Sequence, residues 1–210
     1  MQPQSYPPGA MPSSASTGSS PYSSHASPQP SPVEAYKKAY QQARFIHTTN
    51  KDNLEGILNE GLDPKYAGTA KGMTYMRNPD DEEFIRDAKN TGVHLFHGPA
   101  KDATYGSYLA SKKKTPSALR VFLDRDQVAA TGKDPQDRTA TGYRALIPPT
   151  AIKPVLEDDR PERTPAAQAQ ARQARFRIIG SHLDRPLSDA ELSTLHKQAS
   201  DSGAISDDDD

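Results

Sequence analysis

The sequence contains no cysteine, and its first 32 residues carry no Asp, Glu, Lys or Arg. The missing cysteine excludes disulfides, thiolate nucleophiles and zinc–thiolate sites, and the few histidines are too scattered along the chain to predict a metal site. No apolar run approaches the roughly 20 residues that a membrane helix needs, and the first residues lack the basic and hydrophobic segments of a secretory signal. We therefore expect a soluble protein without a metal and without a membrane span.

The length and charge of the chain further limit the kinds of fold and partner to be expected. A chain of 210 residues has room for one ordinary domain with flexible additions. Its formal net charge is -1 and its apolar fraction 33%. The chain therefore has no overall electrostatic field that would favour nucleic acid or an anionic membrane as a partner. Any binding specificity must come from local groups.

Composition divides the chain into three parts. Residues 1–32 are rich in serine and proline, and such a segment cannot bury enough apolar surface to offset the entropy of ordering. We interpret it as a disordered leader, either a linker or an export leader of the kind that bacterial injection systems use. A folded domain is expected over 33–198, followed by a loose acidic tail over 199–210.

Periodicity predicts alternating helices and strands in the folded part. A helix is expected from Val33 over "VEAYKKAYQQA", then a strand "RFIHTT" that ends near His47, then a helix over 52–60 that Gly61 terminates. Further on, the pattern predicts a helix over 100–110 and strands over 92–96, 118–124, 143–148 and 175–181. This order favours an α+β fold with a split β core, mixed or antiparallel and flanked by short helices, over a doubly wound parallel sheet.

Two of these strand–helix units carry an ordered pair of motifs. The first is "HTTNKDNLEGILNEGL", in which a His-Thr-Thr at a strand precedes an Asn-x-x-x-Ile-Leu-x-x-Gly-Leu helix. The second is "GVHLFHGPAKDATYG", from Gly92 to Gly106. Together they resemble the ADP-ribosyltransferase superfamily, in its poly-ADP-ribose polymerase and diphtheria-toxin-like branch, over roughly 44–152.

The resemblance implies a site for NAD. His47 would hold a ribose hydroxyl, the backbone of Thr48 would pair with the nicotinamide amide, and Thr49 would add a hydroxyl contact. Tyr105 occupies the position of an aromatic that stacks on the nicotinamide ring. The start of the helix at Asp52 would add partial positive charge near the pyrophosphate. The remaining motif positions that the resemblance assigns to the cofactor are Asn53, Gly92, His94 and Phe96.

The sequence departs from the family pattern at two places. His94 stands where the family has a tyrosine, so the nicotinamide ring would lie between an imidazole and Tyr105. The glutamate that the family carries at a late strand is absent, because Gly142, Tyr143 and Arg144 occupy the expected positions. Arg144 is the alternative candidate, since a guanidinium can hold a pyrophosphate or a carboxylate with two hydrogen bonds.

The resemblance leads to one expected function and two alternatives. The expected function is mono-ADP-ribosyl transfer by a monomeric, secreted bacterial effector that acts on a protein in the host cytoplasm, with ubiquitin and small GTPases as acceptor classes. The loop from Ala130 to Gly142 would read the acceptor. One alternative is an inactive NAD or ADP-ribose binding module, which would remain cytoplasmic. The other is an RNA 2′-phosphotransferase or a nucleic-acid ADP-ribosyltransferase.

Each candidate residue also has a purely structural interpretation. A histidine on a strand can be a satisfied structural residue, which applies to both His47 and His94. Tyr105 and Tyr108, at helical spacing, can form part of a helix core.

Overall fold

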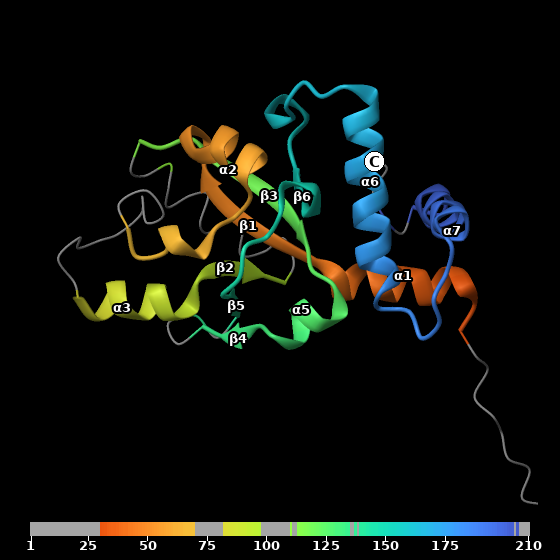
Figure 1. Ribbon diagram of the computed structural model, residues 1–210, viewed down its shortest axis with the longest axis horizontal. Helices are drawn as coiled ribbons and strands as arrows, with labels where there is room; N and C mark the ends of the chain where they lie inside the picture. The colour runs from red at the N-terminus through yellow and green to blue at the C-terminus, as the bar shows by residue number, and fades with distance from the viewer. Residues whose placement is uncertain are drawn as a thin grey trace, which may run out of the picture.

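The computed structural model describes residues 30–69, 82–97, 110, 113–134, 137, 139–203 and 205. They form an α+β fold around one six-stranded sheet, with the order β4–β5–β2–β1–β3–β6 (Figure 1). The strands are β1 (Arg44–Asn50), β2 (Val93–Phe96), β3 (Pro116–Phe122), β4 (Gly132–Lys133), β5 (Ala140–Tyr143) and β6 (Ile152–Pro154). Each neighbouring pair is antiparallel, which confirms the expected α+β class and the antiparallel alternative for its β core.

The helices occupy two different places relative to the sheet. The described helices are α1 (Pro32–Ala43), α2 (Leu54–Glu60), α3 (Glu82–Thr91), α5 (Arg125–Ala129), α6 (Pro165–Gly180) and α7 (Asp189–Asp201). Helices α1, α6 and α7 gather at one end of the sheet, whereas α2 lies over its other part (Figure 1). No helix in the described part of the chain is both long and apolar enough to cross a membrane.

Two apolar clusters correspond to these two regions. The sheet core joins the inward side of β1, β2 and β3 to α2, and it includes Phe45, Leu95, Leu119, Leu54 and Leu58. The helical core joins α1, α6 and α7, and it includes Tyr36, Tyr40, Phe176, Ile179 and Leu192. Alternate residues of each strand enter the sheet core, as the period of two in a half-buried strand requires.

The helix after β1 begins later than the sequence predicts. A 3-10 turn covers Lys51–Asn53 and α2 starts at Leu54. The spacing of Asp52 and Glu55 predicts a capping box at the start of this helix, but Asp52 accepts a hydrogen bond from Asn50 Nδ2 at 2.8 Å instead. Gly61 ends the helix with φ +94°, as expected of a left-handed terminator. The resulting α2 has only seven residues, so it provides little helix dipole for a pyrophosphate.

Two predicted strands are wrong. The pattern at 143–148 places a strand too late, since β5 ends at Tyr143 and only an isolated bridge from Ile147 to Leu62 follows. The pattern at 175–181 lies in the last turns of α6. That helix starts with a Thr164 cap and a proline in its first turn, and it buries Arg175, Phe176 and Ile179 at helical spacing.

The ends of the folded part also differ from the expected boundaries. Helix α1 begins at Pro32, and Ser31 forms a reciprocal capping box with Glu34, so these residues belong to the domain. At the other end α7 continues to Asp201, and Ala199 and Ile205 are buried in the helical core. The leader up to residue 29, the end of the tail and most of the helix expected over 100–110 lie outside the described residues.

Candidate functional site

His47 lies in the middle of β1, not at its end as expected. Its Nδ1–H donates to the backbone carbonyl of His94 in β2, with 2.8 Å between Nδ1 and the oxygen. The two motifs that are 47 residues apart in the sequence are thereby joined by one hydrogen bond. The acceptor is main-chain, so the bond depends on the position of β2 and on no particular side chain there.

The strand β1 is paired very unequally with its two neighbours. Seven residue pairs join it to β3, whereas its described register with β2 consists of the pair Ile46↔Phe96. Backbone bonds from Lys51 to Thr115 and from Leu123 to Ala43 show that odd-numbered residues of β1 exchange hydrogen bonds with β3. The even-numbered residues therefore direct their N–H and C=O groups toward β2.

This alternation locates the point at which β1 and β2 diverge. After Ile46↔Phe96, the next hydrogen-bonded pair of a continuous ladder would be Thr48 with His94. The described register does not extend to that pair, and the His94 carbonyl accepts the imidazole of His47 instead. The backbone N–H and C=O of Thr48 therefore face β2 at the point where the two strands diverge.

The environment of His47 keeps its ring neutral. The residue is half-buried, and protein atoms surround the ring closely enough that loss of solvent lowers the pKa of His47 from 6.5 to about 4. The hydrogen bond to the His94 carbonyl acts in the opposite direction but does not compensate. At neutral pH the proton therefore stays on Nδ1, and Nε2 carries a lone pair that can accept a hydrogen bond from a hydroxyl.

The His94 side chain forms a close pair with an aspartate from the hairpin of β4 and β5. Its Nδ1 lies 2.6 Å from Oδ2 of Asp134, and the side chains of His94 and Asp134 are 17% and 1% exposed. The other carboxylate oxygen of Asp134 accepts the backbone N–H of Asp137 at 3.3 Å. Asp134 belongs to the loop that was expected to read the acceptor, but the sequence alone does not single it out.

The pleat places the two histidine rings on opposite faces of the sheet. Ile46 and Phe96 are directly opposed and share a face, and His94 follows Phe96 at a distance of two residues. His47 is adjacent to Ile46 and shares the other face with Phe45, whose ring lies 4.3 Å from that of His97. The two imidazoles therefore flank the divergence of β1 and β2 from opposite sides.

Several of the other candidate residues have clear structural roles. Thr49 and Phe96 are buried within the sheet. Gly92 has φ +79°, and a Cβ there would collide with the backbone of Tyr143, so a glycine is required for the packing alone. Asn53 precedes α2 without capping it through its side chain.

Arg144 and Tyr105 are not placed beside His47. Arg144 is exposed and directly follows β5, where its Cα would lie 3.2 Å from a Cβ at Gly92. It thus stands at the edge of the sheet where β2 begins, without a contact that assigns it a role. Tyr105 lies outside the described residues, so the ring pair of His94 and Tyr105 stays a prediction.

An ion pair between a half-exposed lysine and a buried carboxylate fixes the turn that follows β1. Lys51 Nζ lies 2.6 Å from one oxygen of Asp159, and Ser117 donates to the other oxygen at 2.6 Å. Burial alone would raise the pKa of Asp159, but the hydrogen bonds from Lys51 and Ser117 outweigh it and lower that pKa. The C-terminal end of β1 is thereby held against β3, which leaves the divergence on the β2 side.

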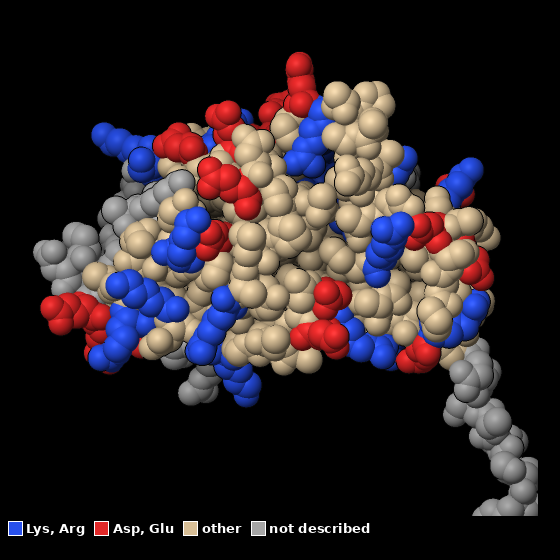
Figure 2. Space-filling view, in the orientation of Figure 1, with Lys and Arg blue, Asp and Glu red and all other residues tan. Residues whose placement is uncertain are grey.

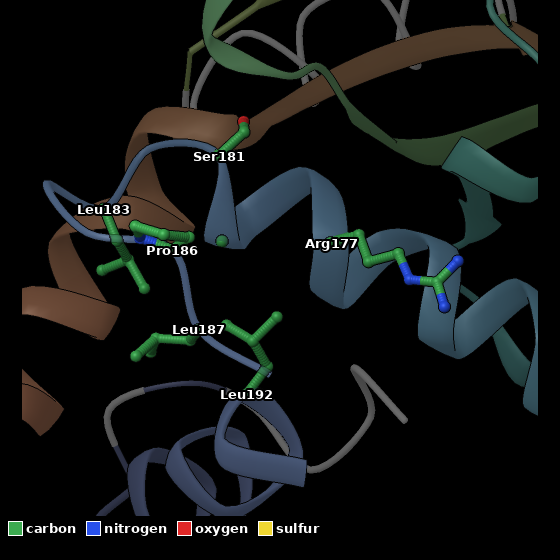
Figure 3. A pocket seen from close by; sticks show the side chains of 7 residues that line it. Arg177, Ser181, Leu183, Pro186, Leu187 and Leu192 are labelled. Atoms are coloured by element: carbon green, nitrogen blue, oxygen red, sulfur yellow. The ribbon is translucent and has the colours of Figure 1, made fainter. Parts of the chain in front are cut away.

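A surface hollow elsewhere in the described chain lacks groups for catalysis. It lies between the end of α6, the following loop and the start of α7 (Figure 3), and its lining consists of Arg177, Gly180, Ser181, Leu183, Pro186, Leu187 and Leu192. The Arg177 guanidinium is already bound to Asp189 by two hydrogen bonds of 3.0 and 2.7 Å. The hollow therefore combines aliphatic and polar surface around a guanidinium that is already paired, and the histidine pair remains the stronger candidate.

The comparisons with known proteins and the charge distribution add two findings. The chain gave no significant match to protein-family models, to curated proteins or to solved structures. On the face drawn in Figure 2, basic side chains are scattered among acidic ones and form no continuous basic surface. The described residues contain no cluster of three His, Asp or Glu side chains that could hold a metal.

Proposed function

We propose that this protein is an NAD-dependent mono-ADP-ribosyltransferase that acts on a protein acceptor. The observation that carries the proposal is the hydrogen bond from His47 to the His94 carbonyl, at the place where the ladder between β1 and β2 stops. It joins the two motifs on which the resemblance rests. A chance pair of motif-like segments would have no reason to meet at a divergence of two strands.

The geometry there fits what cleavage of NAD requires. A nicotinamide amide needs one N–H and one C=O on the same backbone edge, and Thr48 directs both groups toward β2. A ribose hydroxyl needs a fixed acceptor, and the neutral His47 ring has its Nε2 available for that role. Tyr105 would complete the site by stacking on the nicotinamide ring.

The proposal also includes the number of ADP-ribose units transferred, the kind of acceptor and the place where the protein acts. Transfer of a single ADP-ribose is favoured over polymer formation, because β5 ends in Gly142 and Tyr143, without a glutamate. A host protein such as ubiquitin or a small GTPase would be the acceptor of a secreted, monomeric effector.

A second candidate function is an inactive NAD-binding module. The missing glutamate favours it, and the carboxylate that lies beside a candidate residue, that of Asp134, is already paired with His94. The RNA-directed alternatives have less support, because the net charge is -1 and the visible face carries charges of both signs.

Release of nicotinamide from NAD by the purified full chain tests the proposal. We expect time-dependent nicotinamide release, together with transfer of labelled ADP-ribose to a protein when cell lysate is added. NAD binding by calorimetry without any release would identify the inactive module instead. NAD consumption that requires a 2′-phosphorylated RNA would identify the phosphotransferase.

A further inference from the structure

The pair of Asp134 and His94 is unusual because its carboxylate is almost completely removed from solvent. The Asp134 side chain is 1% exposed, and its oxygens face His94 Nδ1 at 2.6 Å and the N–H of Asp137 at 3.3 Å. A buried carboxylate is costly unless donors surround it. The imidazole comes from β2 and the N–H of Asp137 from the loop after β4, so two separate segments of the chain converge on this carboxylate.

The sheet brings the two side chains together across β5. His94 is paired with Gly142, and Gly142 in turn is paired with Gly132 of β4. Asp134 follows β4 directly and continues the hairpin through a bond from its N–H to the Ala140 carbonyl. Residue 142 has to be a glycine, because a Cβ there would collide with the Thr91 carbonyl at 2.4 Å.

The pairing determines the tautomer of His94. With a carboxylate oxygen 2.6 Å from Nδ1, a lone pair on that nitrogen would face the negative charge, so the proton of a neutral His94 resides on Nδ1. Nε2 then carries the lone pair, and among the described residues it has no hydrogen-bond partner. The ring is 17% exposed, so a small molecule or a hydroxyl group has access to it.

We propose that Asp134 is a positioning residue that fixes His94 as the proton acceptor of the transfer reaction, in place of the glutamate that β5 lacks. This inference rests on the proposed function. The bond between C1′ of the ribose and the nicotinamide nitrogen breaks, and both electrons leave with neutral nicotinamide. The oxygen of water or of an acceptor hydroxyl forms a bond to C1′, its proton passes to Nε2 of His94, and the Asp134 carboxylate stabilises the imidazolium.

The variant Asp134→Asn and the matched control Asp137→Asn test this role. Each substitution removes one negative charge from the same loop, but the Asp137 carboxylate binds Thr139 and not His94. Long-range ¹H–¹⁵N spectra of the ¹⁵N-histidine-labelled full chain report the tautomer, and His94→Gln assigns the signal. We expect an Nδ1–H tautomer in the wild type and in Asp137→Asn, and an altered tautomer in Asp134→Asn.

The kinetics of nicotinamide release give the second readout. For Asp134→Asn we expect kcat to fall at least about 10²-fold, with KM for NAD within about two-fold of the wild type. Asp137→Asn should stay within about two-fold in both constants. An Nε2–H tautomer in the wild type overturns the inference even if Asp134→Asn does not fold. An unchanged tautomer and kcat in folded Asp134→Asn overturn it too.

The two proposals can fail separately. If the wild type releases no nicotinamide, the proposed function fails, while the spectra still decide whether Asp134 controls His94. If nicotinamide is released but the His94 tautomer does not depend on Asp134, the transferase stands and the proton acceptor must be another group.

Discussion

Two regions of the molecule each enclose a histidine, and they do so in contrasting ways. In the helical region, His196 of α7 is 3% exposed, its Nδ1 lies 3.1 Å from the Tyr36 hydroxyl, and the Phe176 ring centre is 4.5 Å away. In the sheet region, His47 is only half-buried, and it binds a backbone carbonyl at a place where two strands diverge.

The two environments distinguish a histidine that fills a hydrophobic core from one whose ring keeps a nitrogen for a ligand. His196 contacts residues of α1 and α6 and therefore joins three helices. His47 satisfies one backbone group with Nδ1 and keeps Nε2 for another partner. Burial of an imidazole alone would not distinguish the two, whereas the nature of its partner does.

The largest expected effect is the loss of activity in His47→Ala. We expect nicotinamide release to fall at least about 10²-fold, since positioning of a reacting group commonly carries that much. The fold should survive, because His47 is half-buried and β1 retains its pairing with β3. Circular dichroism and NAD turnover, measured on the same sample, check both parts. Retained turnover in the folded variant would exclude the role of His47.

The pH dependence of stability is the second way to sharpen the comparison. The pKa of His47 is lowered to about 4 in the folded state, so the unfolded chain binds an additional proton between pH 6.5 and 4. Its contribution to stability is present above pH 6.5 and is lost as the pH falls toward 4. The complete loss amounts to roughly 3 kcal/mol of unfolding free energy.

Urea unfolding of the wild type and of His47→Gln over this pH range measures that contribution. The glutamine amide can still donate to the His94 carbonyl but does not titrate, and the carboxylates of both proteins titrate alike. We expect the difference in unfolding free energy to decline by up to the stated amount as the pH falls. If the unfolding free energies of the two proteins change in parallel with pH, the pKa of His47 is the same in the folded and the unfolded chain.

For the helical region we expect the opposite result, a loss of stability with little loss of activity. His196→Ala should lower the unfolding free energy by about 2 kcal/mol, because it leaves a cavity beside Phe176 and removes a hydrogen bond to the Tyr36 hydroxyl. Nicotinamide release per folded molecule should remain within about two-fold of the wild type. Chemical denaturation and turnover at a temperature where the variant is folded separate the two effects. A large loss of turnover in folded protein would mean that the helical region contributes to the site.

The sequence identified the elements with a strong local signal and missed those that depend on distant partners. The helix expected from Val33, the strand through His47 and the termination at Gly61 follow from helical periodicity, a β-rich run and a left-handed glycine, although the first helix starts one residue earlier, at Pro32. The segment 175–181 alternates like a strand, yet the alanine-rich run before it makes it the end of a helix.

The candidate site shows the same limit more sharply. Ordered motifs placed His47 and His94 in neighbouring roles before any contact was known. The partner of His94 could not be predicted, because Asp134 comes from a polar loop and meets the ring only when β5 pairs with both β2 and β4. The position of the two rings on opposite faces likewise depends on the register, which is a property of paired strands.

The smallest expected effect concerns the start of the helical region, at Ser31. Deletion of residues 1–29 should leave the melting temperature and NAD turnover unchanged, because a serine- and proline-rich segment cannot supply a core.

Deletion of residues 1–31 also removes the Ser31 side chain, which accepts the Glu34 N–H at 3.2 Å, and the Ser31 N–H, which donates to the Glu34 carboxylate at 2.9 Å. That loss should cost about 1 kcal/mol of unfolding free energy. The point variant Ser31→Ala in the full chain is the matched control, since it removes the side-chain cap and keeps the leader. If the shorter deletion alone lowers the melting temperature by several degrees, the leader packs on α1, α6 and α7. The helical region would then include more of the chain than the helices beginning at Pro32.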